Sequence, residues 1–154
     1  MRIAAILVLL AGAAVADPYL SVAKGIGDYL VQTAREDGEG RYWAQYEGPG
    51  REAMGEEHLF PVSLYSGSTG TGYFLLNLFR ATRAKSYRKA AQGAGVRLIR
   101  IAQEAPGGGL RWEGQYERRG RAVPDGTRLG LYNGNAGIGW LLIRMQQSIE
   151  YSGF

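Results

Sequence analysis

Two stretches rich in aromatic and acidic residues carry most of the side chains in this chain that could do chemistry. Residues 36–65 and 105–132 each place a tryptophan close to tyrosine and glutamate. A pair of carboxylates is what glycoside hydrolysis requires, and aromatic rings beside them would suit a groove for a carbohydrate or a peptide. The candidate groove residues are Trp43, Tyr46, Glu47, His58, Trp112, Glu113 and Tyr116.

The same residues also allow a structural interpretation. The two tryptophans stand at equivalent places in two halves of the chain, which favours a packing role at helix ends, with the acids facing solvent. His58 is the single histidine of a chain that has no cysteine, so a metal or acid/base site around it lacks second ligands. We identify no nucleophile with its base, and Ser66 and Ser68 suit helix capping. Catalytic residues therefore stay unassigned.

A repeated glycine motif gives the strongest signal of architecture. Residues 64–76 read LYSGSTGTGYFLL, and residues 131–143 read LYNGNAGIGWLLI, at an offset of 67 with six of 13 positions identical. Upstream, Gly40-Arg41-Tyr42-Trp43 corresponds to Gly109-Leu110-Arg111-Trp112 at an offset of 69. A repeat of this kind predicts units that bury their apolar faces only against one another.

Hydrophobic spacing predicts four helices and no long strand, hence an all-α fold. Asp17 suits an N-cap and Pro18 the first helical position, and Asp37-Gly38 suits the end of that helix. Gly93 and Gly95 weaken the third helix, and Pro106 follows it. The expected helices span residues 18–35, 69–82, 86–104 and 137–150.

The motif glycines stand where a loop enters an apolar helix. We expect Gly67 to take a backbone conformation that is closed to residues with a Cβ atom, and the others to let inner helices approach closely despite the cost of glycine in a helix. Phosphate binding fits less well, because dinucleotide sites have a different glycine order and follow a strand. The motif glycines are Gly67, Gly70, Gly72, Gly134, Gly137 and Gly139.

The first 16 residues predict an export signal. Arg2 precedes an apolar run from Ile3 to Val15, and Ala14-Val15-Ala16 offers a small-x-small cleavage site. The run is shorter than the roughly 20 residues that span a bilayer. We expect cleavage after Ala16, a secreted or periplasmic location and no stable membrane anchor.

Composition narrows the class of partner. The net charge is +4, and its basic residues are spread out rather than gathered in a stripe, so we expect no nucleic acid as a partner. The 24 glycines are about twice the usual share, and they cluster in the repeated motif and the loops before it. That distribution indicates positional use rather than low complexity.

The glycine motifs, with Trp43 and Trp112 upstream, resemble the repeats of the lanthionine synthetase C-like (LanC-like) family. The resemblance covers nearly all of residues 17–154, as two repeats of about 18–82 and 86–150. It implies an α/α toroid of helical hairpins around an axis, here an incomplete ring. Cyclase-type members bind zinc through two cysteines and a histidine, and the metal activates a peptide thiol. No such ligand position can be carried over to this chain, so neither zinc nor another cofactor is expected.

These motifs and the resemblance lead to three candidate functions. The first is an exported LanC-like toroid protein, a fragment or a degenerate member, without zinc-dependent thioether cyclase activity. The second is an exported α/α-toroid enzyme that acts on carbohydrate, related in plan to glycoside hydrolases. The third is a non-catalytic binding module that completes its core by self-association or with further repeats.

Overall fold

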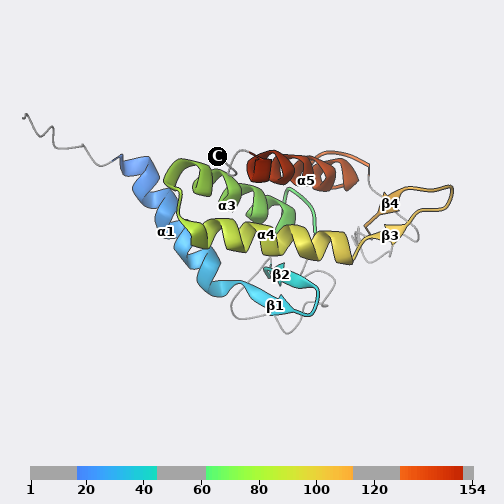
Figure 1. Cartoon of the computed structure of the whole chain (residues 1–154), viewed down its shortest axis with the longest axis horizontal. Coiled ribbons are helices and arrows are strands. Elements are labelled where there is room, and N and C mark those ends of the chain that lie inside the picture. The colour runs from blue at the N-terminus through green and yellow to red at the C-terminus, as the bar shows by residue number, and fades with distance from the viewer. Residues whose placement is uncertain (1–16, 45–61, 113–128, 151–154) are drawn as a thin grey trace, which may run out of the picture.

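The computed structural model describes residues 17–44, 62–112 and 129–150 (Figure 1). Across these ranges the fold is mainly helical. The helices are α1 (Pro18–Thr33), α3 (Ser68–Thr82), α4 (Lys85–Arg100) and α5 (Asn135–Glu150). No helix in the described ranges is long and apolar enough to cross a membrane.

The helix ends follow from local chemistry. Asp17 caps α1, because its Oδ1 accepts hydrogen bonds from the backbone N–H groups of Tyr19 and Leu20, and Pro18 opens the helix as predicted. Helix α3 ends where Arg83 adopts φ 62°, a left-handed conformation that turns the chain sharply. Only Arg83 and Ala84 separate α3 from α4, so these two helices form a tight hairpin.

Two short β-hairpins, which the sequence did not predict, join the helices of this mainly helical fold. Strand β1 (Arg35–Asp37) pairs with β2 (Gly40–Tyr42), and β3 (Gln103–Glu104) pairs with β4 (Leu110–Arg111), both antiparallel. The first helix therefore ends at Thr33 rather than at residue 35, and the third at Arg100 rather than at residue 104. Strands this short carry too little alternation to be read from sequence.

The helices form two layers, with α1 and α4 in one and α3 and α5 in the other (Figure 1). Helix α3 contacts all three of the other helices, which fits its apolar composition on nearly every side. Helix α4 is continuous through Gly93 and Gly95. The core between the layers consists of Trp43, Leu75, Leu76, Leu78, Phe79, Tyr87, Ala90, Ala91, Ala94, Leu98, Trp112, Ile138, Leu141 and Met145.

The two glycine motifs make the same backbone turn. Gly70 donates to the Gly67 carbonyl at 3.0 Å, and Gly137 donates to the Gly134 carbonyl at 3.1 Å. A Cβ atom on Gly70 would collide with the carbonyl oxygen of Leu64, and one on Gly137 with that of Leu131. Gly67, by contrast, has φ −127° and ψ −172°, an extended conformation open to any residue, so the conformational role predicted for it is wrong.

A buried tyrosine joins α1 to α4. The Tyr87 hydroxyl on α4 donates to Asp28 Oδ1 on α1 at 2.6 Å and lies 3.5 Å from the Lys24 carbonyl oxygen. The hydrogen bond to Asp28, burial and the negative charge of Asp28 raise the pKa of Tyr87 to about 12. The protonated phenol is therefore part of the packing between α1 and α4.

Replacing a motif glycine should destabilise the turn that leads into the helix. Gly137→Ala forces a Cβ atom against the Leu131 carbonyl oxygen, so we expect a loss of about 1–3 kcal/mol in the free energy of unfolding. Gly38→Ala is the control, because a Cβ atom there meets nothing within 4 Å and should leave stability equal or slightly higher. Urea unfolding followed by circular dichroism measures both, and equal losses would contradict the collision.

Alkaline pH should weaken the contact between α1 and α4. The pKa of Tyr87 is raised from its ordinary value near 10 to about 12, so the stabilisation is complete below about pH 10 and is lost as the pH rises through about 12. Tyr87→Phe should lower the free energy of unfolding by about 1–2 kcal/mol at neutral pH and remove that part of the alkaline decline. Urea unfolding of both proteins between pH 8 and 12 tests this, and parallel pH profiles would refute it.

Candidate functional site

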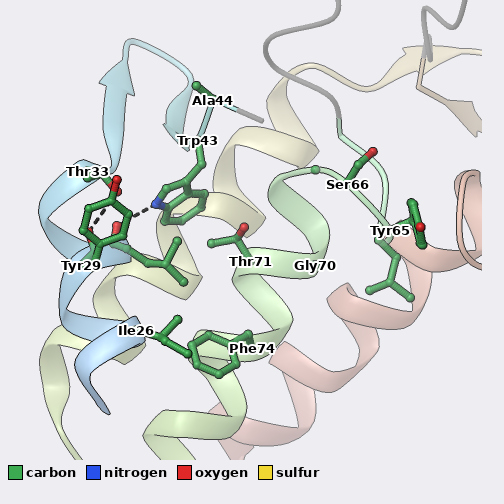
Figure 2. Close-up of a pocket in the computed structure, with 13 residues that line it drawn as sticks. Ile26, Tyr29, Thr33, Trp43, Ala44, Tyr65, Ser66, Gly70, Thr71 and Phe74 are labelled. Atoms are coloured by element: carbon green, nitrogen blue, oxygen red, sulfur yellow. Dashed lines mark hydrogen bonds between the residues drawn. The ribbon is translucent and has the colours of Figure 1, made fainter. Parts of the chain in front are cut away.

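A pocket of about 960 Å³ opens between α1 and the N-terminal half of α3 (Figure 2). Helix α1 contributes its second half, the glycine motif contributes its loop, and α3 contributes its first two turns. The lining residues are Ile26, Tyr29, Leu30, Thr33, Trp43, Ala44, Leu64, Tyr65, Ser66, Gly67, Gly70, Thr71 and Phe74.

The pocket walls are apolar and aromatic, with a few hydroxyl groups. Tyr29 and Tyr65 are exposed at its rim, while Ile26 and Phe74 lie together at one end and Trp43 lies at the other (Figure 2). None of the lining residues carries a carboxylate, an imidazole or a thiol. The described walls can therefore hold an apolar or aromatic group, but they supply no acid, base or nucleophile of the usual catalytic kinds.

Trp43 is fixed by hydrogen bonds and is only 5% exposed. Its Nε1 donates to the Leu30 carbonyl near the end of α1 at 2.7 Å, and its backbone N–H donates to Ser68 Oγ at 3.4 Å. Through its side chain and its backbone, Trp43 thus joins the end of α1 to the start of α3. Its burial leaves little ring surface for stacking on a ligand.

Trp112 repeats this arrangement in the second half of the chain. Its Nε1 donates to the Leu98 carbonyl near the end of α4 at 2.6 Å, and its backbone N–H donates to Asn135 Oδ1 at the start of α5 at 3.4 Å. The structure does not bring Trp112 into the pocket that Trp43 lines. The geometry favours a packing role for both tryptophans.

The remaining candidate groove residues belong to other stretches of the chain. Tyr46, Glu47, His58, Glu113 and Tyr116 lie outside the described residues. Within the described ranges, no group of three His, Cys, Asp or Glu side chains could hold a metal ion.

The second repeat shows which element lies at the place that corresponds to this pocket. At the offset of 67, Thr71 and Phe74 correspond to Ile138 and Leu141, which are 1% and 0% exposed. Leu141 is buried against α3, since its Cδ2 lies 3.3 Å from where a Cβ atom on Gly72 would be. The part of the pocket beside Phe74 therefore corresponds to the place that α3 occupies beside Leu141 in the second repeat. We call this pocket the helix seat, because a helix packed against Phe74 would fill it.

Sequence reasoning missed the residues that define this seat. Ile26 and Tyr29 were available as part of an apolar stripe on α1, together with Tyr19 and Val22 at helical spacing. The sequence showed too many apolar residues on α1 for a helix with one buried side. That excess was the signal.

Removing either indole N–H should cost stability rather than ligand binding. Trp43→Phe and Trp112→Phe each delete a hydrogen bond to a helix carbonyl and some buried surface, so we expect each to lower the free energy of unfolding by about 1–2 kcal/mol. Trp140→Phe is the control, since its ring is partly exposed and can still stack on Tyr73. Equal stability of all three variants in urea unfolding would contradict the packing role.

Comparison with known proteins adds no family to this geometry. No protein-family model matches the chain, and neither a curated protein nor a solved structure matches it.

Proposed function

We propose that this chain is an exported LanC-like α/α-toroid module that works by docking repeat against repeat, without zinc-dependent thioether cyclisation. The repeated sequence supports this, because it is accompanied by repeated contacts. Each tryptophan donates a hydrogen bond to a carbonyl near the end of the preceding helix. In each glycine motif, a leucine carbonyl oxygen lies where a Cβ atom on the second glycine would be.

The observation that carries the proposal is a helix face that is covered in one repeat and open in the next. On α3, Thr69, Gly72, Leu76 and Phe79 are buried, where α4 and α5 pack against the helix. The equivalent residues of α5 are Ala136, Gly139, Ile143 and Gln146. Leu76 is 3% exposed, whereas its equivalent Ile143 is 59% exposed.

This open face is the right kind of surface for docking. Ala136, Gly139, Ile143 and Gln146 recur at three- and four-residue spacing, so they share one side of α5. Apart from its chain neighbours and its own helix backbone, no atom of the described residues lies within 4 Å of where a Cβ atom on Gly139 would be. Another helix can therefore approach α5 here as closely as α4 approaches α3.

The chain does not supply the ligands of the cyclase zinc site. That site needs two thiolates and an imidazole, and this chain has no cysteine and one histidine. Docking is also better supported than a sugar groove built on Trp43 and Trp112, because both indoles are buried and engaged by helix carbonyls.

A charge on the open face of α5 should abolish docking without unfolding the chain. Ile143→Lys places an ammonium group at the centre of the face, whereas Gln147→Lys places one where α3 has the exposed Arg80. We expect the full chain and Gln147→Lys to associate as concentration rises in sedimentation velocity, and Ile143→Lys to stay monomeric with an unchanged circular dichroism spectrum. A monomeric full chain at every concentration would refute the docking function.

Zinc analysis of the same preparation tests the second half of the proposal. We expect the purified chain to carry no stoichiometric zinc and to add none on dialysis against it. Zinc bound at one ion per chain would contradict the proposal that cyclase-type chemistry is lost.

A further inference from the structure

We propose that the open face of α5 is covered by α1 and α3 of a second copy of this chain, joined head to tail in the register of its own internal repeats. This proposal rests on the docking function and names its partner. The occupant follows from the fold, because α4 already plays the covering role within one chain and α1 is the equivalent of α4.

Helix α1 matches α4 at an offset of 68. Tyr19, Ala23, Gly27 and Leu30 correspond to the identical residues Tyr87, Ala91, Gly95 and Leu98. The contacts match as well, since a Cβ atom on Gly27 would meet Leu78 of α3 and one on Gly95 would meet Met145 of α5. Leu78 and Met145 are themselves equivalent at the offset of 67.

The covering side of α4 is buried, and the same side of α1 is exposed. Tyr87, Ala90 and Ala94 are 2%, 0% and 0% exposed, whereas their equivalents Tyr19, Val22 and Ile26 are 84%, 64% and 49% exposed. Helix α1 therefore presents an apolar stripe of the kind that α4 buries against α1 and α3. No helix of the described residues buries this stripe on α1.

The contacts within the chain fix the register between copies. A Cβ atom on Gly72 would lie 3.2 Å from the Ala94 Cβ and 3.3 Å from the Leu141 Cδ2. Gly139 is the equivalent of Gly72, Ile26 of Ala94 and Phe74 of Leu141. The same contact between two copies therefore places Gly139 of one copy against Ile26 and Phe74 of the next. Ile26 and Phe74 line the 960 Å³ pocket, so α5 of one copy fills the helix seat of the other.

The hairpins continue the same interface. Gly93 on α4 lies against the side chain of Arg41, whose Cγ would be 2.7 Å from a Cβ atom there. The equivalents of these two residues are Gly25, with nothing within 4 Å, and Leu110, which is exposed on β4. Head-to-tail docking places Leu110 of one copy over Gly25 of the next.

The loops add one backbone hydrogen bond to the register. Tyr65 donates its N–H to the Tyr132 carbonyl at 2.9 Å between the two glycine motifs. In the proposed contact between two copies, the equivalent bond runs from the Tyr132 N–H of one copy to the Tyr65 carbonyl of the next. Both tyrosine side chains are exposed in the single chain.

The large exposed apolar side chains of the described residues all belong to the two proposed contact faces. The end formed by α1 and the first glycine motif carries Tyr19, Val22, Ile26, Tyr29 and Tyr65. The end formed by α4, α5, β4 and the second motif carries Val96, Ile99, Leu110, Leu129, Leu131, Tyr132 and Ile143. The two faces differ, so the contact is heterologous, and association proceeds past the dimer until a ring closes or a filament grows.

Complementation between two surface variants tests this arrangement on the full chain, produced and processed in an exporting host. Val22→Lys blocks the α1 face, and Ile143→Lys blocks the α5 face. We expect each variant alone to associate at least about tenfold more weakly than the unchanged chain. Their equimolar mixture should form a one-to-one dimer that grows no further, since one intact face of each kind remains.

Matched controls keep this test specific. Ser21→Lys lies next to Val22, and the equivalent of Ser21 on α4 is the exposed Lys89. Ser21→Lys and Gln147→Lys should assemble like the unchanged chain. If Val22→Lys alone still dimerises while Ile143→Lys does not, the contact is a symmetric pairing of α5 with α5, and the head-to-tail proposal is overturned while the docking function stands.

Disulfide trapping tests the register, because the chain has no cysteine of its own. Gly139→Cys in one copy and Ile26→Cys in another should form a covalent heterodimer under mild oxidation. At the equivalent place within the chain, a Cβ atom on Gly72 would lie 3.2 Å from the Ala94 Cβ, near the roughly 3.5–4.5 Å between the Cβ atoms of a disulfide. Gly139→Cys with Ser21→Cys is the control and should stay uncrosslinked. Assembly without the 139–26 crosslink overturns the register, and a chain that never assembles overturns the docking function with it.

Discussion

The lack of a side chain at a few glycines is the constraint on which this fold depends. At Gly70 and Gly137 a leucine carbonyl oxygen lies where a Cβ atom would be, so the loop can turn tightly into the helix. At Gly72 the space goes instead to neighbouring helices, since Ala94 Cβ and Leu141 Cδ2 lie 3.2 Å and 3.3 Å from where a Cβ atom would be. The loss of helix propensity at glycine, about 1 kcal/mol each, is offset by the burial that this close approach permits.

Much of the fold could be predicted from the sequence because its signals are local. Periodicity and capping residues gave four helices, with errors of a few residues at their ends, and Asp17 and Pro18 gave the first boundary. The hairpins escaped notice because β1 and β3 depend on partners across a turn, and strands of two or three residues leave no alternation to detect. The backbone conformation predicted for Gly67 was wrong because a glycine can occupy a buried, extended position as well as one with unusual dihedral angles.

The candidate site was harder to predict than the fold. Trp43 and Trp112 stood out by type, but only their hydrogen bonds to Leu30 and Leu98 reveal that they join helix ends. The pocket residues Ile26 and Phe74 looked like ordinary core positions, since a sequence cannot say which apolar side of a helix lacks a neighbour. Burial compared between equivalent positions supplies that information, and it turns a pocket without charged or nucleophilic walls into half of an interface.

The tight turn at Arg83 has a consequence for how such a chain can grow or shrink. Helices α3 and α4 are joined by two residues, yet α3 ends one sequence repeat and α4 begins the next. The pair of helices with the shortest connection, α3 and α4, is therefore out of phase with the unit that the sequence repeats. Gene duplication that copies a whole sequence repeat adds one helix to each layer and preserves every turn. A cut made at the turn itself would separate two helices that pack against each other as a hairpin.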